Sequence, residues 1–455
     1  MGQSDFPVRN RRVLVVGAAR SGIAAAELLA KRGAVVTLTD LRQQVEATDA
    51  LRARGVVLEL GGHRAGTFAI ADLIVVSPGV PLEQPVFEAA RRRGTEIIGE
   101  LELAWRWTAG RVIAVTGTKG KSTTTTLIGR MLGAAGRKAL VGGNIGVPLS
   151  AQVDDSTPET MHVVETSSFQ LDTTTTFHPW IAVWLNLADD HLDRHSSLDA
   201  YATAKARIFA NQTADDWAVV NADDRTVMAR SRDTAARKVQ FALSGRIADG
   251  FVVEGDWIVR RTTTGAERLF PVASVELTGR HLLNNVLAAT AVASLAGCSS
   301  QAMTAALRGF HGLEHVMEPV GDVRGVRFVN DSKATNVEAA RRSIESFAAG
   351  VVAIVGGRFK GGDLAQLREP LAAVGRAVVA IGEAAPLVHE ALSGVVPVID
   401  AASMREAVER AYEAAGAGGV VLLAPACASF DWFRDYAERG SAFKGEVRRL
   451  KARVE

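Results

Sequence analysis

Three times along the chain, a short run of apolar, mostly β-branched residues ends in glycine and is followed by an alanine- and leucine-rich helical pattern. The runs occupy residues 13–17, 112–117 and 351–357. A strand that turns at glycine into a helix is the opening unit of a doubly wound, mostly parallel sheet. Because each run can open its own sheet, the sequence predicts an α/β protein of three domains, which span residues 1–105, 106–312 and 313–455.

Size and charge narrow the class of protein. The 455 residues exceed one ordinary core, since a domain usually takes roughly 100–200 residues. Basic and acidic side chains, 52 and 50 in number, leave a net charge of +2, which argues against a protein that binds nucleic acid through phosphate contacts. We therefore expect no nucleic-acid partner.

The chain shows no sign of a membrane segment or an export signal. Its apolar runs are shorter than the ~18–20 residues that span a bilayer, so no membrane insertion is expected. Residues 1–12 are polar and basic and lack the apolar segment of a signal peptide. Cys298 and Cys427 form no Cys-x-x-Cys pair. We expect a cytoplasmic, monomeric protein with reduced thiols.

The most specific motif follows the second run and reads Thr-Gly-Thr-Lys-Gly-Lys-Ser-Thr at residues 116–123. A glycine-rich loop between a strand and a helix surrounds phosphate oxygens with backbone N–H groups, and the helix N-terminus adds positive potential. Lys121 would reach the β- and γ-phosphates of ATP, and Ser122 would ligate Mg²⁺. A tight glycine turn with a surface lysine is the alternative.

The central domain is accordingly predicted to be P-loop ATPase-like. Its loop departs from the standard spacing, because Val115 stands where that motif has its first glycine. The predicted ATP-binding residues of the loop are Gly117, Thr118, Lys119, Gly120, Lys121, Ser122 and Thr123.

Two downstream segments carry groups that suit a metal ion beside phosphates. The run at residues 163–165 ends in Glu165, and a carboxylate at the C-terminal end of a strand is well placed to hold Mg²⁺. A polar cluster with Asn186 and His191 comes next, and Lys205 lies in a helical pattern. From the residues alone, Glu165 and Lys205 can equally be solvated and the cluster can equally be a polar loop.

The altered loop, followed in order by Glu165, Asn186, His191 and Lys205, resembles the Mur ligase family within the superfamily that also holds the folylpolyglutamate synthetases. Members join an amino acid to a carboxylate through an acyl phosphate. The resemblance implies ATP and two Mg²⁺ ions, with Asn186 near the activated carboxylate and Lys205 carbamylated. It makes Lys121, Asn186, His191 and Lys205 catalytic, and it assigns the metal to Ser122, Glu165, His191 and Lys205.

Two positions depart from the family pattern. The family usually has His-Asn-x-x-Asn where this chain has His281, Leu282 and, at the second asparagine, Asn285. It usually has arginine where this chain has Val316. The resemblance associates both positions with nucleotide contacts, so Asn285 is predicted to bind ATP, and the departures put details of adenine and phosphate binding in doubt. His311 and His315 are predicted to be structural.

The N-terminal run opens a variant nucleotide-binding turn, Gly-Ala-Ala-Arg-Ser-Gly at residues 17–22, and Asp40 ends the second strand. A Rossmann-like domain of this kind suits a dehydrogenase cofactor or a UDP group. In the D-glutamate-adding members of the family, this domain binds UDP-N-acetylmuramoyl-L-alanine. The resemblance assigns that ligand to Ser21, Asp40, Arg42, Ser77, Gly79 and Asn144.

The C-terminal, also Rossmann-like, domain points to the same members of the family. The segment Asn-Asp-Ser-Lys-Ala-Thr-Asn at residues 330–336 and the segment 421–443 resemble theirs. By that resemblance, Asp331 and Lys333 contact the ATP ribose and phosphates. The two carboxylates of D-glutamate are assigned to Thr335 with Lys360, and to Ser429 with the backbone near Tyr436.

The resemblance therefore implies an ATP-dependent ligase that adds D-glutamate to UDP-N-acetylmuramoyl-L-alanine during peptidoglycan precursor synthesis. Three alternatives stay open at this point. A sister ligase would keep the centre and change both ends. A nicotinamide dehydrogenase would explain the first glycine turn and leave the Gly-Lys-Ser loop unexplained. A nucleotide-gated regulatory module would bind ATP without turnover.

Overall fold

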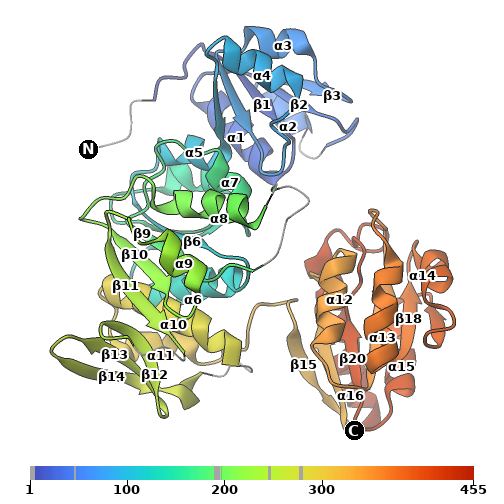
Figure 1. The fold of residues 1–455 in the computed structure, drawn as a ribbon. Helices are drawn as coiled ribbons and strands as arrows, with labels where there is room; N and C mark the ends of the chain where they lie inside the picture. The colour runs from blue at the N-terminus through green and yellow to red at the C-terminus, as the bar shows by residue number, and fades with distance from the viewer. Residues whose placement is uncertain (1–5, 46–47, 189–194, 196, 244–246, 276–279) are drawn as a thin grey trace. The chain divides into compact units, whose positions relative to one another are not determined.

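The computed structural model describes residues 6–45, 48–188, 195, 197–243, 247–275 and 280–455. The chain divides into two compact units, Met1–Phe310 and His311–Glu455. Their described residues form three sheets, two in the first unit and one in the second (Figure 1). This confirms the prediction of three α/β domains, while the boundaries near residues 106 and 312 stay a prediction.

The N-terminal sheet has five parallel strands in the order β3-β2-β1-β4-β5. Apolar clusters cover both of its faces, as expected of a doubly wound sheet. The elements are β1 (Arg12–Val16), α1 (Arg20–Lys31), β2 (Val35–Asp40), α2 (Thr48–Ala53), β3 (Val57–Leu60), α3 (Ala65–Ile70), β4 (Leu73–Val76), α4 (Pro85–Arg92) and β5 (Glu96–Gly99).

The central sheet has nine strands in the order β14-β13-β12-β11-β10-β9-β6-β8-β7. Its strands are β6 (Arg111–Thr116), β7 (Ala139–Gly143), β8 (Met161–Glu165), β9 (Ile181–Trp184), β10 (Trp217–Asn221), β11 (Arg237–Ala242), β12 (Gly250–Glu254), β13 (Trp257–Thr262) and β14 (Gly265–Pro271). Its helices are α5 (Glu100–Trp105), α6 (Lys121–Ala134), α7 (Ser168–Asp172), α8 (Leu198–Ala206), α9 (Arg225–Arg230), α10 (Arg280–Leu295) and α11 (Ser300–Leu307).

The inserted strands differ in one respect from the prediction. We expect short antiparallel strands between residues 240 and 278, and β12, β13 and β14 do pair antiparallel. However, β12 pairs parallel with β11, so the insertion continues the main sheet before it turns back. The helix expected at residues 281–296 is α10.

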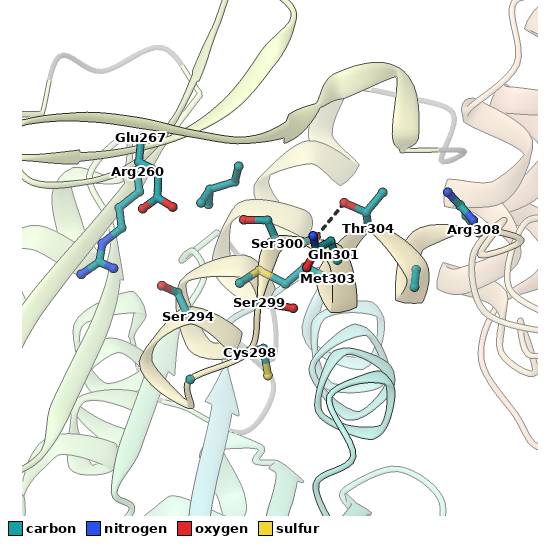
Figure 2. Close-up of a pocket in the computed structure, with 13 residues that line it drawn as sticks. Arg260, Glu267, Ser294, Cys298, Ser299, Ser300, Gln301, Met303, Thr304 and Arg308 are labelled. Carbon is teal, nitrogen blue, oxygen red and sulfur yellow. Dashed lines mark hydrogen bonds between the residues drawn. The ribbon is translucent and has the colours of Figure 1, made fainter.

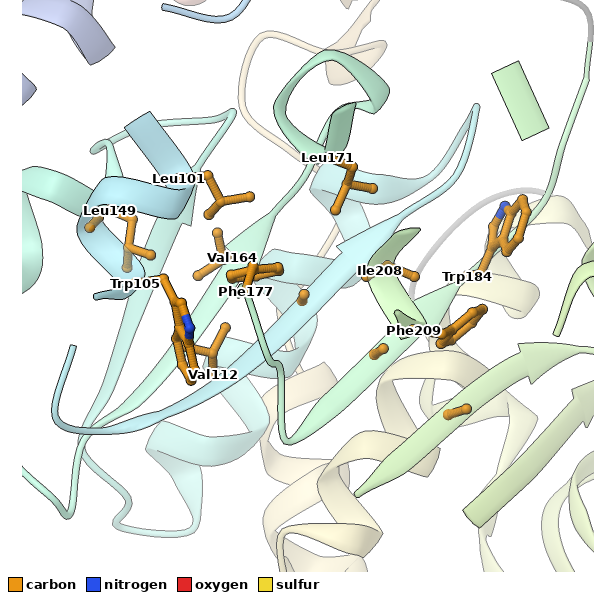
Figure 3. Packing of buried hydrophobic residues seen from close by; sticks show 14 of the residues in the cluster. Leu101, Trp105, Val112, Leu149, Val164, Leu171, Phe177, Trp184, Ile208 and Phe209 are labelled. Carbon is orange, nitrogen blue, oxygen red and sulfur yellow. The ribbon is translucent and has the colours of Figure 1, made fainter. Parts of the chain in front are cut away.

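The core of the central sheet draws on segments that lie far apart in the sequence. Trp105 and Leu101 come from α5, Trp184 from β9 and Phe209 from the turn after α8 (Figure 3). Helix α5 directly follows the N-terminal sheet, so its burial here joins the first sheet to the second. Burial of such large side chains contributes on the order of 2–3 kcal/mol each.

A buried carboxylate fixes the same junction. Glu102 of α5 accepts hydrogen bonds from the backbone N–H groups of Thr175, Thr176 and Phe177, and Arg106 pairs with it at 3.0 Å. Although burial by itself raises the pKa of Glu102, the hydrogen bonds from Thr176 and Thr175 outweigh burial and lower it. The charged form is therefore the one that fastens α5 to the central domain.

The second unit contains a six-stranded sheet in the order β15-β16-β20-β17-β18-β19, and β15 alone among its described strands pairs antiparallel. Its strands are β15 (Glu318–Val323), β16 (Val326–Asn330), β17 (Val351–Gly356), β18 (Gly375–Ile381), β19 (Val398–Ala401) and β20 (Val420–Leu423). Its helices are α12 (Val337–Glu345), α13 (Arg368–Val374), α14 (Ala385–Leu392), α15 (Met404–Ala415) and α16 (Tyr436–Val454). Among the described residues, no helix combines the length and apolar character needed to cross a membrane.

The histidine of β8 predicts a pH dependence of stability. His162 is fully buried; its Nε2 lies 2.8 Å from Ser156 Oγ and its Nδ1 lies 3.3 Å from Gln152 Oε1. Burial lowers its pKa to about 4. An unfolded histidine takes up a proton below pH ~6.5, so between that pH and about 4 the unfolded state binds more protons. Stability should fall as the pH falls through this window, by up to ~3 kcal/mol.

Urea unfolding at several pH values between 4 and 7 measures this slope. His162→Gln should flatten it by about one proton, whereas His389→Gln, which alters a surface histidine beside Asp400, should leave it unchanged. A His162→Gln slope equal to that of the wild type would show that His162 is not the titrating group.

Candidate functional site

The phosphate loop lies between β6 and α6, as predicted. Gly117 and Gly120 have φ values of +152° and +83°, a region that glycine adopts without strain. Lys121 begins α6 and folds back, so that its Nζ donates to the carbonyl oxygens of Gly117 at 3.0 Å and Thr118 at 2.9 Å. The ammonium group and the N-terminus of α6 thus bring positive charge to one short loop.

Asn186, in the segment that follows β9, braces this loop by hydrogen bonds. The backbone N–H groups of Thr118 and Lys119 donate to its Oδ1 at 3.0 and 2.9 Å, and its Nδ2 donates to the Lys119 carbonyl at 3.0 Å. The segment that carries Asn186 is held in turn, because the Asp224 carboxylate accepts a hydrogen bond from the N–H of the adjacent Leu187 at 2.8 Å. Asn186 therefore sets the shape of the loop, a role that the sequence analysis did not assign to it.

Glu165 lies at the C-terminal end of β8 with both carboxylate oxygens engaged. Ser122 Oγ donates to one oxygen at 2.6 Å and Asn144 Nδ2 donates to the other at 2.8 Å. The residue is only 2% exposed. Three predicted site residues from β8, from α6 and from the loop after β7 therefore meet at one point beside the phosphate loop.

This arrangement suits Mg²⁺. A carboxylate and a hydroxyl are oxygen ligands, which Mg²⁺ prefers, and Mg²⁺ commonly needs only one or two carboxylates because water and substrate phosphates complete its shell. Within the described ranges, no three His, Cys, Asp or Glu residues cluster as a closed metal cage. An open site of this kind fits a metal that is held together with a nucleotide.

Lys205 approaches the loop from α8. Its side chain is 1% exposed, its Nζ donates to the Gly117 carbonyl at 2.8 Å, and it lies 4.5 Å from the centre of the Tyr201 ring. Lys121 donates to the same carbonyl oxygen. Two amino groups thus converge on one acceptor, which places like charges close together if both are protonated.

His191 lies outside the described residues, so its position relative to Glu165 stays a prediction. The flanking residues on both sides are fixed. Ala188 donates its N–H to Thr118 Oγ1 at 3.0 Å, and His195 Nε2 lies 2.9 Å from Ser168 Oγ. Both anchors belong to the immediate surroundings of the loop and of Glu165.

Asn285, on α10, packs against the loop. A methyl group added at Gly120, which has a φ of +83°, would lie 2.2 Å from Asn285 Oδ1, so the contact and the backbone conformation both favour glycine at position 120. Asn285 is buried. The structure therefore brings this predicted ATP-binding residue to the loop despite the departure at Leu282.

The predicted UDP-site residues gather around the first glycine turn. Ala18 donates its N–H to Asp40 at 2.6 Å, Arg42 forms a two-pronged pair with the same carboxylate, and Ser77 Oγ donates to the Gly17 carbonyl at 2.7 Å. The hydrogen bonds from the Arg42 side chain hold the pKa of Asp40 well below its usual range. The charged Asp40 therefore orients Arg42 at the end of β2.

Three further predicted UDP-site residues are placed differently from one another. Ser21 lies in the first turn of α1, and Gly79 has a φ of +88° in the turn after β4. Asn144 is engaged with Glu165 rather than with the first sheet. Arg20 reaches toward it, because its Nη1 lies 3.5 Å from the Gly146 carbonyl.

In the second unit, the predicted ATP and amino-acid residues lie at the C-terminal ends of β16, β17 and β20. Asp331 accepts from the Met317 N–H at 3.1 Å and pairs closely with the Ser343 hydroxyl. Burial raises the pKa of Asp331 against the effect of the Ser343 hydrogen bond. Lys333 donates its N–H to the His315 carbonyl at 3.0 Å.

The four residues assigned to D-glutamate come from four segments. Thr335 is half-buried in the loop after β16, and Ser429 is buried in the loop after β20. Tyr436 begins α16, and Lys360 is exposed in the loop after β17. Arg439 of α16, which is buried beneath these segments, is not among the predicted site residues, because a buried arginine in a helix has no distinctive sequence signal.

A hollow of about 940 Å³ lies elsewhere in the first unit, between the β13–β14 hairpin and helices α10 and α11 (Figure 2). Arg260 and Glu267 line it from the hairpin, and Ser299, Ser300 and Thr304 line it from the start of α11. None of its lining residues is a predicted site residue. The candidate site is therefore the loop and its neighbours, not this hollow.

Comparison with known proteins covers all three parts of the chain. Residues 11–99 match a model of the Mur ligase MurD-like N-terminal domain, residues 115–293 match the Mur ligase middle domain, and residues 317–427 match the Mur ligase glutamate ligase domain. The chain belongs to the Mur ligase family.

Individual relatives agree over their full length. The UDP-N-acetylmuramoylalanine--D-glutamate ligase of Acidobacterium capsulatum is 47% identical over 97% of this chain and 96% of its own. That of Desulfosudis oleivorans is 45% identical over 97% of both chains. Among solved structures, UDP-N-acetylmuramate-alanine ligase from Thermotoga maritima has a TM-score of 0.56 at 18% identity, over 97% of this chain and 100% of that one.

Family membership decides between the alternatives at the level of class. A nicotinamide dehydrogenase would not match ligase models over the N-terminal, central and C-terminal parts together. The N-terminal glycine turn is thus part of a Mur ligase. Its variant form, in which Ala19 replaces a glycine, needs no dinucleotide to explain it.

The loop brace of this Mur ligase gives a testable prediction. Asn186→Ala removes three hydrogen bonds between Asn186 and the loop, and a typical hydrogen bond contributes about 1 kcal/mol. We expect ATP affinity to fall by about tenfold or more. Calorimetric titration with ATP and Mg²⁺ measures the change.

Asn211→Ala is the matched control. It also removes hydrogen bonds to two backbone carbonyls, those of Thr175 and Phe177, but leaves the loop intact. An Asn186→Ala protein that bound ATP within twofold of the wild type would show that the brace does not shape the nucleotide site.

Proposed function

We propose that this Mur ligase adds D-glutamate to UDP-N-acetylmuramoyl-L-alanine with ATP, in the cytoplasmic synthesis of peptidoglycan precursors. The observation that carries the proposal is the 47% identity to a D-glutamate ligase over 97% of the chain. The convergence of Lys121, Ser122, Glu165 and Lys205 on one phosphate loop supports it. We also propose a monomeric enzyme of three domains, 1–105, 106–312 and 313–455, with neither nucleic-acid nor membrane partners.

Each of the residues around the loop takes a defined role. Loop N–H groups and the N-terminus of α6 bind phosphate oxygens, with Gly117, Thr118, Lys119, Gly120 and Thr123 forming the cradle. Lys121 exchanges its carbonyl partners for phosphate and offsets the negative charge that develops during transfer.

Ser122 and Glu165, joined by His191 and Lys205, hold Mg²⁺ directly or through water. When bound, Mg²⁺ would neutralise phosphate charge and orient the transferred group. Asn186 keeps the loop in shape near the activated carboxylate, Asn285 supports the nucleotide beside Gly120, and Asp331 and Lys333 contact its ribose and phosphates.

The chemistry proceeds in two balanced steps. The L-alanyl carboxylate attacks the γ-phosphorus of ATP, the bond to the β–γ bridging oxygen breaks, and an acyl phosphate and ADP form. The D-glutamate amine then attacks the acyl carbon, phosphate leaves and the amine loses its proton as the amide forms. Ser21, Asp40, Arg42, Ser77 and Gly79 of the N-terminal domain, with Asn144 of the central domain, hold the UDP substrate, and Thr335, Lys360, Ser429 and Tyr436 hold D-glutamate.

The surroundings of Lys205 favour carbamylation. Lys205 and Lys121 donate to the same carbonyl oxygen, so their amino groups would repel each other if both were protonated. A neutral amine avoids this repulsion and is the form that reacts with carbon dioxide. The resulting carbamate would be an anion, which suits a residue beside the Lys121 ammonium that would help to hold Mg²⁺.

Phosphate release tests the proposed activity. With ATP, Mg²⁺ and UDP-N-acetylmuramoyl-L-alanine, release should depend on D-glutamate and not on L-glutamate or L-alanine. Lys121→Ala should lower the rate at least about a hundredfold, because it removes a charge that stabilises the transition state. Lys138→Ala, which changes an exposed lysine bonded to the Asp155 carbonyl, should retain wild-type activity.

Either of two results would contradict the proposal. Release that depends on another amino acid would move the specificity to a sister ligase. ATP binding without release under any condition would indicate a regulatory protein.

Carbamylation of Lys205 has its own test. Protein exchanged into ¹³C-labelled bicarbonate should show a carbamate carbon signal that Lys205→Arg lacks and Lys138→Arg retains, because arginine keeps the charge and cannot carry a carbamate. Lys205→Arg should also lose most ligase activity. Identical spectra for the wild type and Lys205→Arg would show that Lys205 stays a cation.

A further inference from the structure

Arg439 is a buried cation at the start of α16. It lies one turn after Tyr436, and its side chain is 1% exposed. Burial lowers its pKa to about 10, so the guanidinium keeps its charge at neutral pH. A group of this kind is retained in a core only where its hydrogen bonds are made, and all three of its nitrogens make them.

The guanidinium joins two loops. Its Nε donates to Ser332 Oγ at 3.0 Å and its Nη2 donates to the Ser332 carbonyl at 2.9 Å. Its Nη1 donates to the Cys427 carbonyl at 3.1 Å. Ser332 Oγ in turn donates to the Tyr436 carbonyl at 2.7 Å. The loop after β16, the loop after β20 and the first turn of α16 therefore meet at one side chain.

These three segments carry three of the four residues assigned to the two carboxylates of the amino acid, and the fourth, Lys360, lies in the loop after β17. Thr335 follows Ser332 on the first loop, and Ser429 follows Cys427 on the second. The loops are also joined by a direct backbone bond near their base, from the Ala426 N–H to the Ala334 carbonyl at 3.0 Å. Arg439 adds a tie that is made by a rigid, planar side chain.

The second loop needs such a tie because it is strained. Ala426 has a φ of +57°, a left-handed conformation that L-residues other than glycine rarely adopt. The backbone at Ala428, two residues later, is closely packed against Gly357. A methyl group added at Gly357 would lie 2.2 Å from the Ala428 carbonyl oxygen and 3.2 Å from Arg439 Nη1. A strained segment persists only where its surroundings fix it.

The nucleotide side of the first loop has separate supports. Asp331 donates its N–H to the Leu423 carbonyl at 2.9 Å, and Lys333 donates its N–H to the His315 carbonyl at 3.0 Å. Loss of Arg439 therefore leaves these two residues anchored and releases the spacing between the loops. The effect should fall on the amino acid and spare ATP.

We propose that Arg439 is a positioning residue that sets the separation of the two carboxylate-binding loops, and thereby selects a dicarboxylic amino acid by the distance between its carboxylates. The proposal rests on the proposed function, since the loops are assigned to D-glutamate there. The relevant ligand chemistry is a D-amino acid with a second carboxylate at a fixed number of methylene groups. An Arg439→Lys substitution keeps the positive charge but loses the planar guanidinium, whose three nitrogens donate to both loops.

Kinetics with three amino acids test the proposal. Wild type, Arg439→Lys and Arg439→Met are compared with D-glutamate, with D-aspartate, which is one methylene shorter, and with D-2-aminoadipate, which is one methylene longer. In both variants the KM for D-glutamate should rise at least tenfold, and the preference for D-glutamate over the other two should fall at least tenfold. The KM for ATP should stay within threefold.

Matched variants separate positioning from folding. Arg449→Lys and Arg449→Met change an exposed arginine on the same helix, paired with Glu446, and should behave as the wild type. Ser332→Ala removes the contact between Arg439 Nε and Ser332 Oγ, together with the hydrogen bond from Ser332 Oγ to the Tyr436 carbonyl, and keeps the charge of Arg439. It should show a smaller shift in the same direction, and it keeps the test open if Arg439→Met does not fold.

The failures are distinguishable. Wild-type protein without D-glutamate-dependent phosphate release would overturn the proposed function. An active wild type with an Arg439→Lys variant of unchanged selectivity would overturn the positioning role alone. Equal losses for ATP and D-glutamate, together with a lower Tm, would reduce Arg439 to a general structural residue and overturn the proposal as well.

Discussion

The candidate site around the phosphate loop depends on the register of four neighbouring parallel strands, β9, β6, β8 and β7. Val115 of β6 lies opposite Glu165 of β8, which lies opposite Gly143 of β7, and Thr116 lies opposite Trp184 of β9. Because parallel strands end at the same edge, the loop after each strand opens at one place. Slippage of one residue would turn Glu165 to the other face of the sheet and remove the carboxylate from Ser122.

Internal hydrogen bonds hold the phosphate loop in shape. Its N–H groups at Thr118 and Lys119 are satisfied by Asn186, and its carbonyl at Gly117 is satisfied by Lys121 and Lys205. Phosphate must therefore compete with some of these internal bonds when it enters. An ordered loop loses little conformational entropy on binding, which offsets part of the cost of exchanging hydrogen bonds.

Much of the fold and part of the site could be predicted from the sequence, for reasons that particular residues make clear. The three strand runs turn at Gly17, Gly117 and Gly356, each at positive φ, and glycine is the sequence signal of such a turn. Lys121, Ser122 and Glu165 are chemically conspicuous. Arg439 is not predictable, because its partners are the carbonyls of Ser332 and Cys427 and a hydroxyl, and every residue has a carbonyl. The strained turn at Ala426 is equally silent, since alanine gives no indication of a left-handed backbone.

The two departures from the family pattern have different structural weight. On either side of Val316, backbone groups make the contacts to the predicted ATP-binding residues. The Met317 N–H donates to Asp331, and the His315 carbonyl accepts from the Lys333 N–H. Valine supplies that backbone as well as arginine does, so the departure removes only a side-chain contact. At Leu282 an amide is lost from α10, and Asn285, one turn later, is the residue that touches the loop at Gly120. Glycine at position 120 lets Asn285 lie against the loop, so the close approach of α10 to the loop is kept without the first asparagine.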